Sequence, residues 1–362
     1  MRKKLALILS TVLILVICSG CGGSQSATST QQDAPAPSAP SAAPSEADEA
    51  TQAPVDKVFI QLGHADAEVE TAIHHKMALL FQQYVDEMSN GTMEIEIVGS
   101  GQLGGERDMV EGMQLGTIEM ASTANMVLSN FMPEFGVLDL PYVFSDYESA
   151  YRALDSNAIQ TVIEKFAAEK GVRVLAFAQG GFRQVVGNKA VLAVEDLKGM
   201  KIRVPESDIY IDTFNALGAA PTPLAWAETF TAMQQKTVDA FEITPAVVLS
   251  NGFFEVCSDI SVTNHLFSPN PLMIAESLYK SLTEEQQKVL KDAAVKAANE
   301  QRAWIESSTE EVYASLEEKG MKVDRPDLSG FQAVVESAGL YEKYAERIGA
   351  DLIDAVMKAA AA

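Results

Sequence analysis

The sequence predicts an α/β fold of two lobes, with a helical stretch near the C-terminus that is long enough to run along both. Strand patterns at residues 58–62 and 93–98, with helical spacing between them, begin a strand–helix–strand series that is typical of a parallel sheet. A second block of strand and helix patterns lies between residues 181 and 267. From Glu284 no glycine or proline occurs before Gly320, and a helix of that length is about 54 Å long, which exceeds one small lobe. Two stacked helices with a bend are the alternative to one continuous helix.

These patterns assign the first lobe to residues 57–180 with 268–305, and the second lobe to residues 181–267 with 306–362. In the first lobe we expect strands at residues 58–62, 93–98, 117–121, 172–178 and 272–275. We expect helices at residues 69–88, from the glycine run at 99–104 to residue 115, and between residues 147 and 170. In the second lobe we expect strands at residues 183–186, 201–204, 238–241, 255–262 and 321–323, with helices from about 208, from about 227 and after 329. The long helix begins with a capping box, Thr283-Glu284-Glu285-Gln286.

The N-terminal segment carries a signal for export. Residues 1–20 combine a basic start with an apolar run, which is typical of a signal peptide and too short for a stable membrane span. Small residues precede Cys21 and glycines follow it, which resembles a lipoprotein cleavage box; Cys18 remains an alternative, as does plain secretion with a free thiol. Residues 21–56 are rich in Ser, Ala, Pro and Gln, so we expect a lipidated Cys21 and a disordered tether to the cell membrane.

Charge and cysteine content limit the partners of the chain. The formal net charge of −23 would repel nucleic acid, so we expect no nucleic-acid partner. Apart from Cys18 and Cys21 the chain has only Cys257, so no disulfide can form within the folded body. Cys257 lies in an apolar run, and we interpret it as a buried small hydrophobic residue.

Familiar catalytic and metal-binding motifs are missing from the sequence. It contains no H-E-x-x-H, Cys-x-x-Cys, G-x-x-x-x-G-K-[ST] or G-x-S-x-G, so we expect no catalytic residue and no metal site. Residues 99–104 match G-x-G-x-x-G, but the acidic residue that would bind a ribose is not at the end of the following strand, and we expect no cofactor. His74 and His75 are adjacent, and we interpret both as surface or edge histidines.

Arg203 is the strongest candidate for a ligand-binding residue. Residues 201–204 alternate as a short strand, Pro205 ends it, and Ser207 can cap the helix that follows. Arg203 therefore lies at the carboxyl end of a strand, where ligands bind in open α/β sheets. Its guanidinium offers paired donors that match a carboxylate. A surface or ion-paired arginine remains the alternative.

Several segments resemble one family in the same order. They are "GSGQLGGERDMVEGMQLGTIEMA" (99–121), "LPYVFSDYESAYRALD" (140–155), "GGFRQVVGNK" (180–189), "DLKGMKIRVPES" (196–207), "LGAAPTPLAWAETFTAMQQKTVDAFE" (217–242) and "FFEVCSDISVTNH" (253–265). Together they resemble the DctP-type solute-binding proteins of TRAP transporters, over roughly residues 57 to 350. The resemblance implies a periplasmic-binding-protein-like fold with a hinge and a long helix spanning both lobes.

The resemblance also implies site residues. Arg203, in K-I-R-V-P, would be the principal clamp on the substrate carboxylate, and Arg183, in G-F-R-Q, would contact the same group. Further candidates from the resemblance and from their positions after strands are Trp226, Glu106, Asn125, Thr244 and His64.

Two departures from the family pattern bear on the substrate. Ala124 and Val127 stand where sialic-acid-binding members carry Glu and Arg, and "VDAFEITP" replaces the common "VDGQENP", so that Ile243 occupies the usual Asn position. These changes disfavour sialic acid and predict a more apolar pocket for a C4-dicarboxylate or related organic acid. The implied function is an extracytoplasmic, lipid-anchored receptor that delivers this acid to the TRAP permease subunits in the membrane. A secreted α/β enzyme acting on a carboxylate and a ligand-presenting sensor are the alternatives.

The lipoprotein interpretation predicts the effect of Cys21→Ala. The variant should remain unprocessed or be shed from the membrane, since a thioether-linked lipid would be what holds the chain there. Membrane fractionation and the mass of the mature chain measure both effects, with Cys18→Ala as the matched control. Unchanged processing and membrane association of Cys21→Ala would contradict the prediction.

Overall fold

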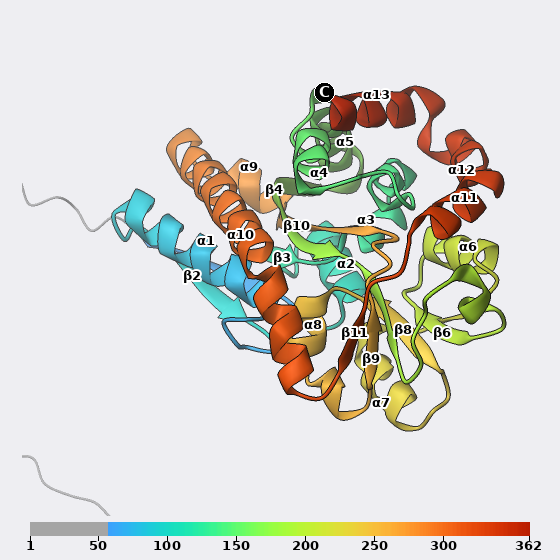
Figure 1. Cartoon of the computed structure of the whole chain (residues 1–362). Coiled ribbons are helices and arrows are strands. Elements are labelled where there is room, and N and C mark those ends of the chain that lie inside the picture. The colour runs from blue at the N-terminus through green and yellow to red at the C-terminus, as the bar shows by residue number, and fades with distance from the viewer. Residues whose placement is uncertain (1–56) are drawn as a thin grey trace, which may run out of the picture. The chain divides into compact units, whose positions relative to one another are not determined.

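The computed structural model describes residues 57–362, which form two sheets with helices on both faces (Figure 1). The predictions for the signal peptide, Cys21 and the tether therefore lie outside the described residues. Within this range no helix is long and apolar enough to cross a membrane.

The first sheet has five strands in the order β2-β1-β3-β10-β4. Strands β1, β2 and β3 are parallel, as the strand–helix–strand pattern predicts, and β10 runs antiparallel between β3 and β4. The strands are β1 (Val58–Gly63), β2 (Met93–Val98), β3 (Met120–Ser122), β4 (Val172–Phe182) and β10 (Phe267–Ala275).

Helices cover both faces of this first sheet. On one face α1 (Ile73–Ser89) packs with α10 (Glu284–Glu318), whose buried alanines, including Ala293 and Ala297, let the two helices and the sheet lie close together. The opposite face packs against α2 (Glu106–Leu115), α4 (Tyr147–Leu154), α5 (Asn157–Lys170) and the 3-10 segment Pro133–Asp139.

The second sheet has six strands in the order β11-β9-β5-β8-β6-β7. Strands β7, β6 and β8 are parallel, whereas β5 is antiparallel to both of its neighbours. The strands are β5 (Gln184–Gly187), β6 (Lys201–Val204), β7 (Ala220–Pro223), β8 (Ala240–Ile243), β9 (Asp259–Ser261) and β11 (Lys322–Asp324). Helices α7 (Thr229–Gln234), α8 (Pro245–Ser250) and part of α10 cover one face, and α6 (Asp208–Ala216) with α11 (Ser329–Ser337) cover the other.

Three segments connect the lobes in addition to the C-terminal helices described below. Strand β4 leads almost directly into β5, and the return strand β10 lies beside it, with the Arg183 N–H donating to the Leu266 carbonyl at 2.8 Å. The third segment is α10, a continuous helix of 35 residues that contacts α1 and β4 in the first lobe and α8 and β11 in the second (Figure 1). The predicted long helix and its cap are confirmed, since Thr283 accepts a hydrogen bond from the Gln286 N–H.

The structure corrects several sequence expectations. Residues 255–262 do not form one strand, because only Asp259–Ser261 pairs with β5 and β11. Ser207 occupies the N-cap position of α6, but its side chain makes no capping hydrogen bond.

The C-terminal helices also differ from the expected lobe boundaries. α13 (Ala350–Ala361) lies on the first lobe, where Ile353 and Val356 pack in the core beside α4 and α5 (Figure 1). α12 (Leu340–Ile348) contacts both lobes, since Ile348 packs in the same core and Arg347 forms an ion pair with Asp208 of α6. The expected assignment of residues 306–362 to the second lobe therefore does not describe these helices.

Candidate ligand-binding site

A cavity of about 40 Å³ lies between the two lobes and receives side chains from both. The first lobe contributes Ala65, Asp66, Ile73, His74, Glu106, Ala124 and Met126. The second lobe contributes Arg183, Arg203, Trp226, Ile243, Thr244 and Val247, and the return strand β10 contributes Ser268 and Asn270.

Arg203 lies at the end of β6, as predicted, and is only 2 % exposed. Its Nε and Nη2 donate to the Leu224 carbonyl at 3.1 and 2.7 Å, and its guanidinium lies 5.8 Å from the Trp226 ring centre. Burial lowers the pKa of Arg203 to about 10, although Glu242 and Glu106 favour the charge. The group is still a cation at neutral pH.

The Arg203 cation has no carboxylate partner within ion-pair distance among residues 57–362, and its Nη1 makes no hydrogen bond there. A buried charge without a partner is costly, so this guanidinium favours an anion in the cavity.

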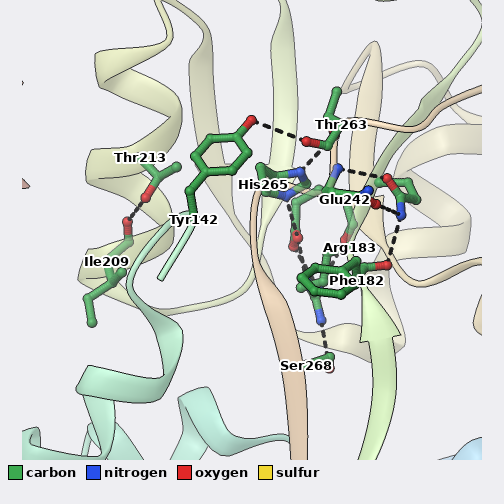
Figure 2. Close-up of polar contacts among 11 residues, drawn as sticks. Tyr142, Phe182, Arg183, Ile209, Thr213, Glu242, Thr263, His265 and Ser268 are labelled. Atoms are coloured by element: carbon green, nitrogen blue, oxygen red, sulfur yellow. Dashed lines mark hydrogen bonds and ion pairs between the residues drawn. The ribbon is translucent and has the colours of Figure 1, made fainter. Parts of the chain in front are cut away.

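Arg183 also lines the cavity, but a protein carboxylate already binds it. Its Nε and Nη2 both donate to the Glu242 carboxylate, the Nη2–Oε1 distance being 2.7 Å, and both side chains are almost completely buried (Figure 2). Its Nη1 lies 3.5 Å from the Ser268 hydroxyl, and the guanidinium lies 5.2 Å from the Tyr210 ring centre. The charge of Arg183 is therefore largely balanced within the protein.

Glu242 belongs to a larger buried network (Figure 2). The His265 Nε2 lies 3.3 Å from the Glu242 carboxylate, and the His265 Nδ1 lies 2.8 Å from the Thr263 hydroxyl. The backbone carbonyl of Thr263 in turn accepts a hydrogen bond from the Tyr142 hydroxyl. Burial alone would raise the pKa of Glu242, but the Arg183 cation lowers it below its ordinary value. Glu242 is thus ionised, and the pair connects β5 with β8 at the point where the chain crosses between lobes.

Three of the other predicted residues lie at the cavity: Glu106, Trp226 and Thr244. The Glu106 carboxylate accepts from the Ala124 N–H at 2.7 Å, and burial raises its pKa. The Thr244 hydroxyl is buried and has no hydrogen-bond partner among residues 57–362, so it can bind a ligand atom.

Two predicted residues are not brought to the cavity. The Asn125 amide points into the first lobe, where it donates to the Phe135 carbonyl and to Asp139, both at 2.9 Å. His64 pairs with His75, with 3.0 Å between Nε2 and Nδ1, and does not line the cavity.

The interpretation of His74 as a surface or edge residue is wrong. Its side chain is buried and lines the cavity, with Nδ1 lying 2.8 Å from the Ser122 hydroxyl. Asp66, which follows β1, accepts from the His74 backbone N–H at 3.1 Å and also lines the cavity. The polar wall that these residues form also differs from the more apolar pocket expected from Ile243.

Sequence reasoning missed Asp66, Ser268, Asn270 and the partner role of Glu242. Asp66 had a usable signal, because it follows the first strand of a parallel sheet at the edge where ligands bind. Ser268 and Asn270 lie inside a strand that is buried along its whole length, and nothing local distinguishes them from structural polar residues.

A family model described as bacterial extracellular solute-binding protein, family 7 (DctP), matches residues 64–347. The chain belongs to this family. It is a TRAP transporter solute-binding protein, as the ordered motifs indicated.

Named relatives and solved structures agree with this assignment. The 2,3-diketo-L-gulonate-binding periplasmic protein YiaO of Escherichia coli is 31 % identical over 255 residues, which is 70 % of this chain and 77 % of YiaO. A TRAP periplasmic solute-binding protein of Polaromonas sp. JS666 bound to D-erythronate aligns with a TM-score of 0.79 and 32 % identity, over 83 % of this chain and 98 % of that one. The protein of Roseobacter denitrificans with bound L-galactonate aligns with a TM-score of 0.77 and 30 % identity, over 83 % and 99 % of the two chains.

The buried carboxyl group of Asp139, which accepts a hydrogen bond from Asn125, should make the stability of the protein depend on pH. Burial raises the pKa of Asp139 to about 8, against the opposing effect of the Asn125 amide. Because the folded state binds this proton more tightly than the unfolded state, stability falls as pH rises from the unfolded pKa toward the folded one. Asp139→Asn should therefore flatten the fall in unfolding free energy between about pH 5 and pH 8.

Urea unfolding at several pH values measures this slope. Asp354→Asn, which changes an exposed carboxylate of α13, is the matched control and should keep the wild-type slope. An Asp139→Asn variant with the wild-type slope would show that Asp139 is ionised in the folded protein.

Proposed function

We propose that this protein is the extracytoplasmic receptor of a TRAP transporter, which binds an organic-acid anion between its lobes and delivers it to the membrane permease subunits. The ligand carboxylate binds the Arg203 guanidinium, and Arg183 contributes its remaining donor, Nη1. The lipid anchor at Cys21 would keep the receptor close to the permease.

The unpaired, buried Arg203 cation is the observation that carries this proposal. An anion would pair with its Nη1, while the Leu224 carbonyl and the Trp226 ring hold the guanidinium in orientation. Arg183 is a weaker contact, because Glu242 already occupies two of its nitrogens. We therefore assign the clamp to Arg203.

The ligand class that we favour is a sugar acid, with one carboxylate and a hydroxylated chain. Solved relatives contain D-erythronate and L-galactonate, and YiaO is named for 2,3-diketo-L-gulonate. The cavity has side chains for hydroxyl groups, among them Thr244, Ser268 and Asn270. A C4-dicarboxylate, the class favoured by the sequence, is the other candidate, and a thermal-shift screen over organic acids compares the two.

We propose that the protein binds its ligand without changing it chemically. A receptor of this kind acts through a closure of its two lobes that the bound ligand favours. Incubation of the protein with the organic acid, followed by mass spectrometry, tests this. A recovered acid of altered mass would favour the enzyme alternative.

The clamp predicts the effect of Arg203→Ala. Removing one partner of a buried charge pair costs about 2–5 kcal/mol, which is a loss of roughly 30- to several-thousand-fold in affinity. Arg203→Lys should recover only part of this loss, because an ammonium group cannot reproduce the planar group in which two nitrogens hold the Leu224 carbonyl and the third faces the ligand. Titration calorimetry measures the affinities, with Arg325→Ala, which changes an exposed arginine outside the cavity, as the matched control.

The same experiment separates binding from folding. An Arg203→Ala variant that melts like the wild type but no longer binds supports the clamp. Unchanged affinity would contradict the assignment of Arg203 as the clamp, and a variant that fails to fold would indicate a structural role for Arg203.

The three crossing segments predict closure of the lobes on binding. Small-angle scattering should show a smaller radius of gyration at saturating ligand than without ligand. Arg203→Ala at the same ligand concentration is the control and should show no change. An unchanged radius with a tightly bound ligand would refute closure.

A further inference from the structure

The first-lobe wall of the cavity is built from two carboxylates and a histidine: Asp66, Glu106 and His74. Backbone and side-chain contacts fix all three. The Asp66 Oδ2 accepts a hydrogen bond from the His74 backbone N–H, and the Glu106 Oε1 accepts one from the Ala124 N–H. The His74 Nδ1 is hydrogen-bonded to the Ser122 hydroxyl. We call these three residues the first-lobe wall.

Each residue of the first-lobe wall keeps one polar atom for a ligand. Within residues 57–362, no hydrogen bond reaches the Asp66 Oδ1, the Glu106 Oε2 or the His74 Nε2. Burial lowers the pKa of His74, so its ring is neutral and can exchange a hydrogen bond with a hydroxyl group. The wall therefore suits a chain of hydroxyls, which can donate to carboxylates.

The charges in the cavity are unequal at its two sides. On the second-lobe side Arg203 is available for one carboxylate, because Glu242 balances Arg183. On the first-lobe side the acidic residues Asp66 and Glu106 face the cavity, and no lysine or arginine of the first lobe lines it. Burial raises the pKa of both carboxyl groups, which shows that negative charge is already unfavourable on this side of the cavity. A second ligand carboxylate would add a further negative charge there with no first-lobe cation to balance it, which is unfavourable.

We propose that the first-lobe wall is a charge filter, which accepts an uncharged hydroxylated end of the ligand and rejects a second carboxylate, with His74 as a specificity-determining residue. This proposal rests on the proposed function, since the filter acts on an acid that Arg203 already holds. It assigns to His74 a direct contact with the end of the ligand remote from the clamp.

Pairs of acids that differ in one group test the filter. Erythronate and meso-tartrate share a four-carbon hydroxylated chain, as galactonate and galactarate share a six-carbon one, and only the second acid of each pair has two carboxylates. In titration calorimetry the wild type should prefer the monocarboxylate of at least one pair by about a hundredfold. Glu106→Gln, which replaces the ionisable carboxyl group by an amide of the same shape, should reduce this preference by about tenfold.

Variants of the two adjacent histidines test the specific role of His74. His74→Leu should weaken binding of the preferred monocarboxylate by about tenfold, because a hydroxyl loses its partner. His74→Gln should retain more of the affinity than His74→Leu. His75→Gln, which changes the neighbouring residue outside the cavity, is the matched control and should bind as the wild type does.

The outcomes distinguish the filter from the receptor function. Equal or tighter binding of the dicarboxylates, or an unchanged preference in Glu106→Gln, would overturn the filter and leave the receptor function intact. A protein that binds no organic acid would overturn both. If Glu106→Gln fails to fold, Asp66→Asn provides the same measurement at the second carboxylate of the wall.

Discussion

The buried ion pair between Arg183 and Glu242 is the interaction on which the arrangement of the site depends. Both side chains are almost completely buried, so removal of either partner would leave the charge of the other uncompensated. The pair joins β5 to β8 where the chain has just crossed from the first lobe, and His265 extends it toward the return strand. It therefore fixes the second sheet relative to the crossing strands.

The same pair determines how the two arginines of the cavity differ. Because Glu242 balances Arg183, the positive charge available to a ligand is mainly that of Arg203, whose nearest oxygen partner is a backbone carbonyl. One such cation matches one carboxylate. The first-lobe residues that line the cavity supply hydrogen-bond acceptors and no further cation, so the proposed filter would distinguish the two ends of the ligand.

Closure and recognition are linked by the way in which the chain crosses between lobes. The cavity is lined by first-lobe residues, by second-lobe residues and by Ser268 and Asn270 of the crossing strand β10. A ligand that contacts all three groups favours the conformation in which they lie together, and this differential contact is what biases a hinge. The long helix α10 contacts both lobes.

The sequence by itself determined most of the helices and strands and the position of Arg203 at the end of a strand. Period-two alternation at residues 201–204, followed by Pro205, placed Arg203 at a strand end, and the stretch without glycine or proline after Thr283 predicted α10. These are local properties, since side-chain periodicity, capping and proline act within a few residues. The order of the family motifs also predicted the two-lobed fold and the family to which the chain belongs.

Only the tertiary structure decided which polar side chains share the cavity. Glu242 pairs with Arg183 across 59 residues because β5 and β8 are antiparallel neighbours, and no local pattern specifies that pairing. His74 and His75 are adjacent on one helix, yet the helix orientation buries the first in the cavity and turns the second to His64. Asn125 follows a strand as predicted, but its amide donates a hydrogen bond to Asp139. A buried amide must be hydrogen-bonded, and the packing of the lobe decides which group is its partner.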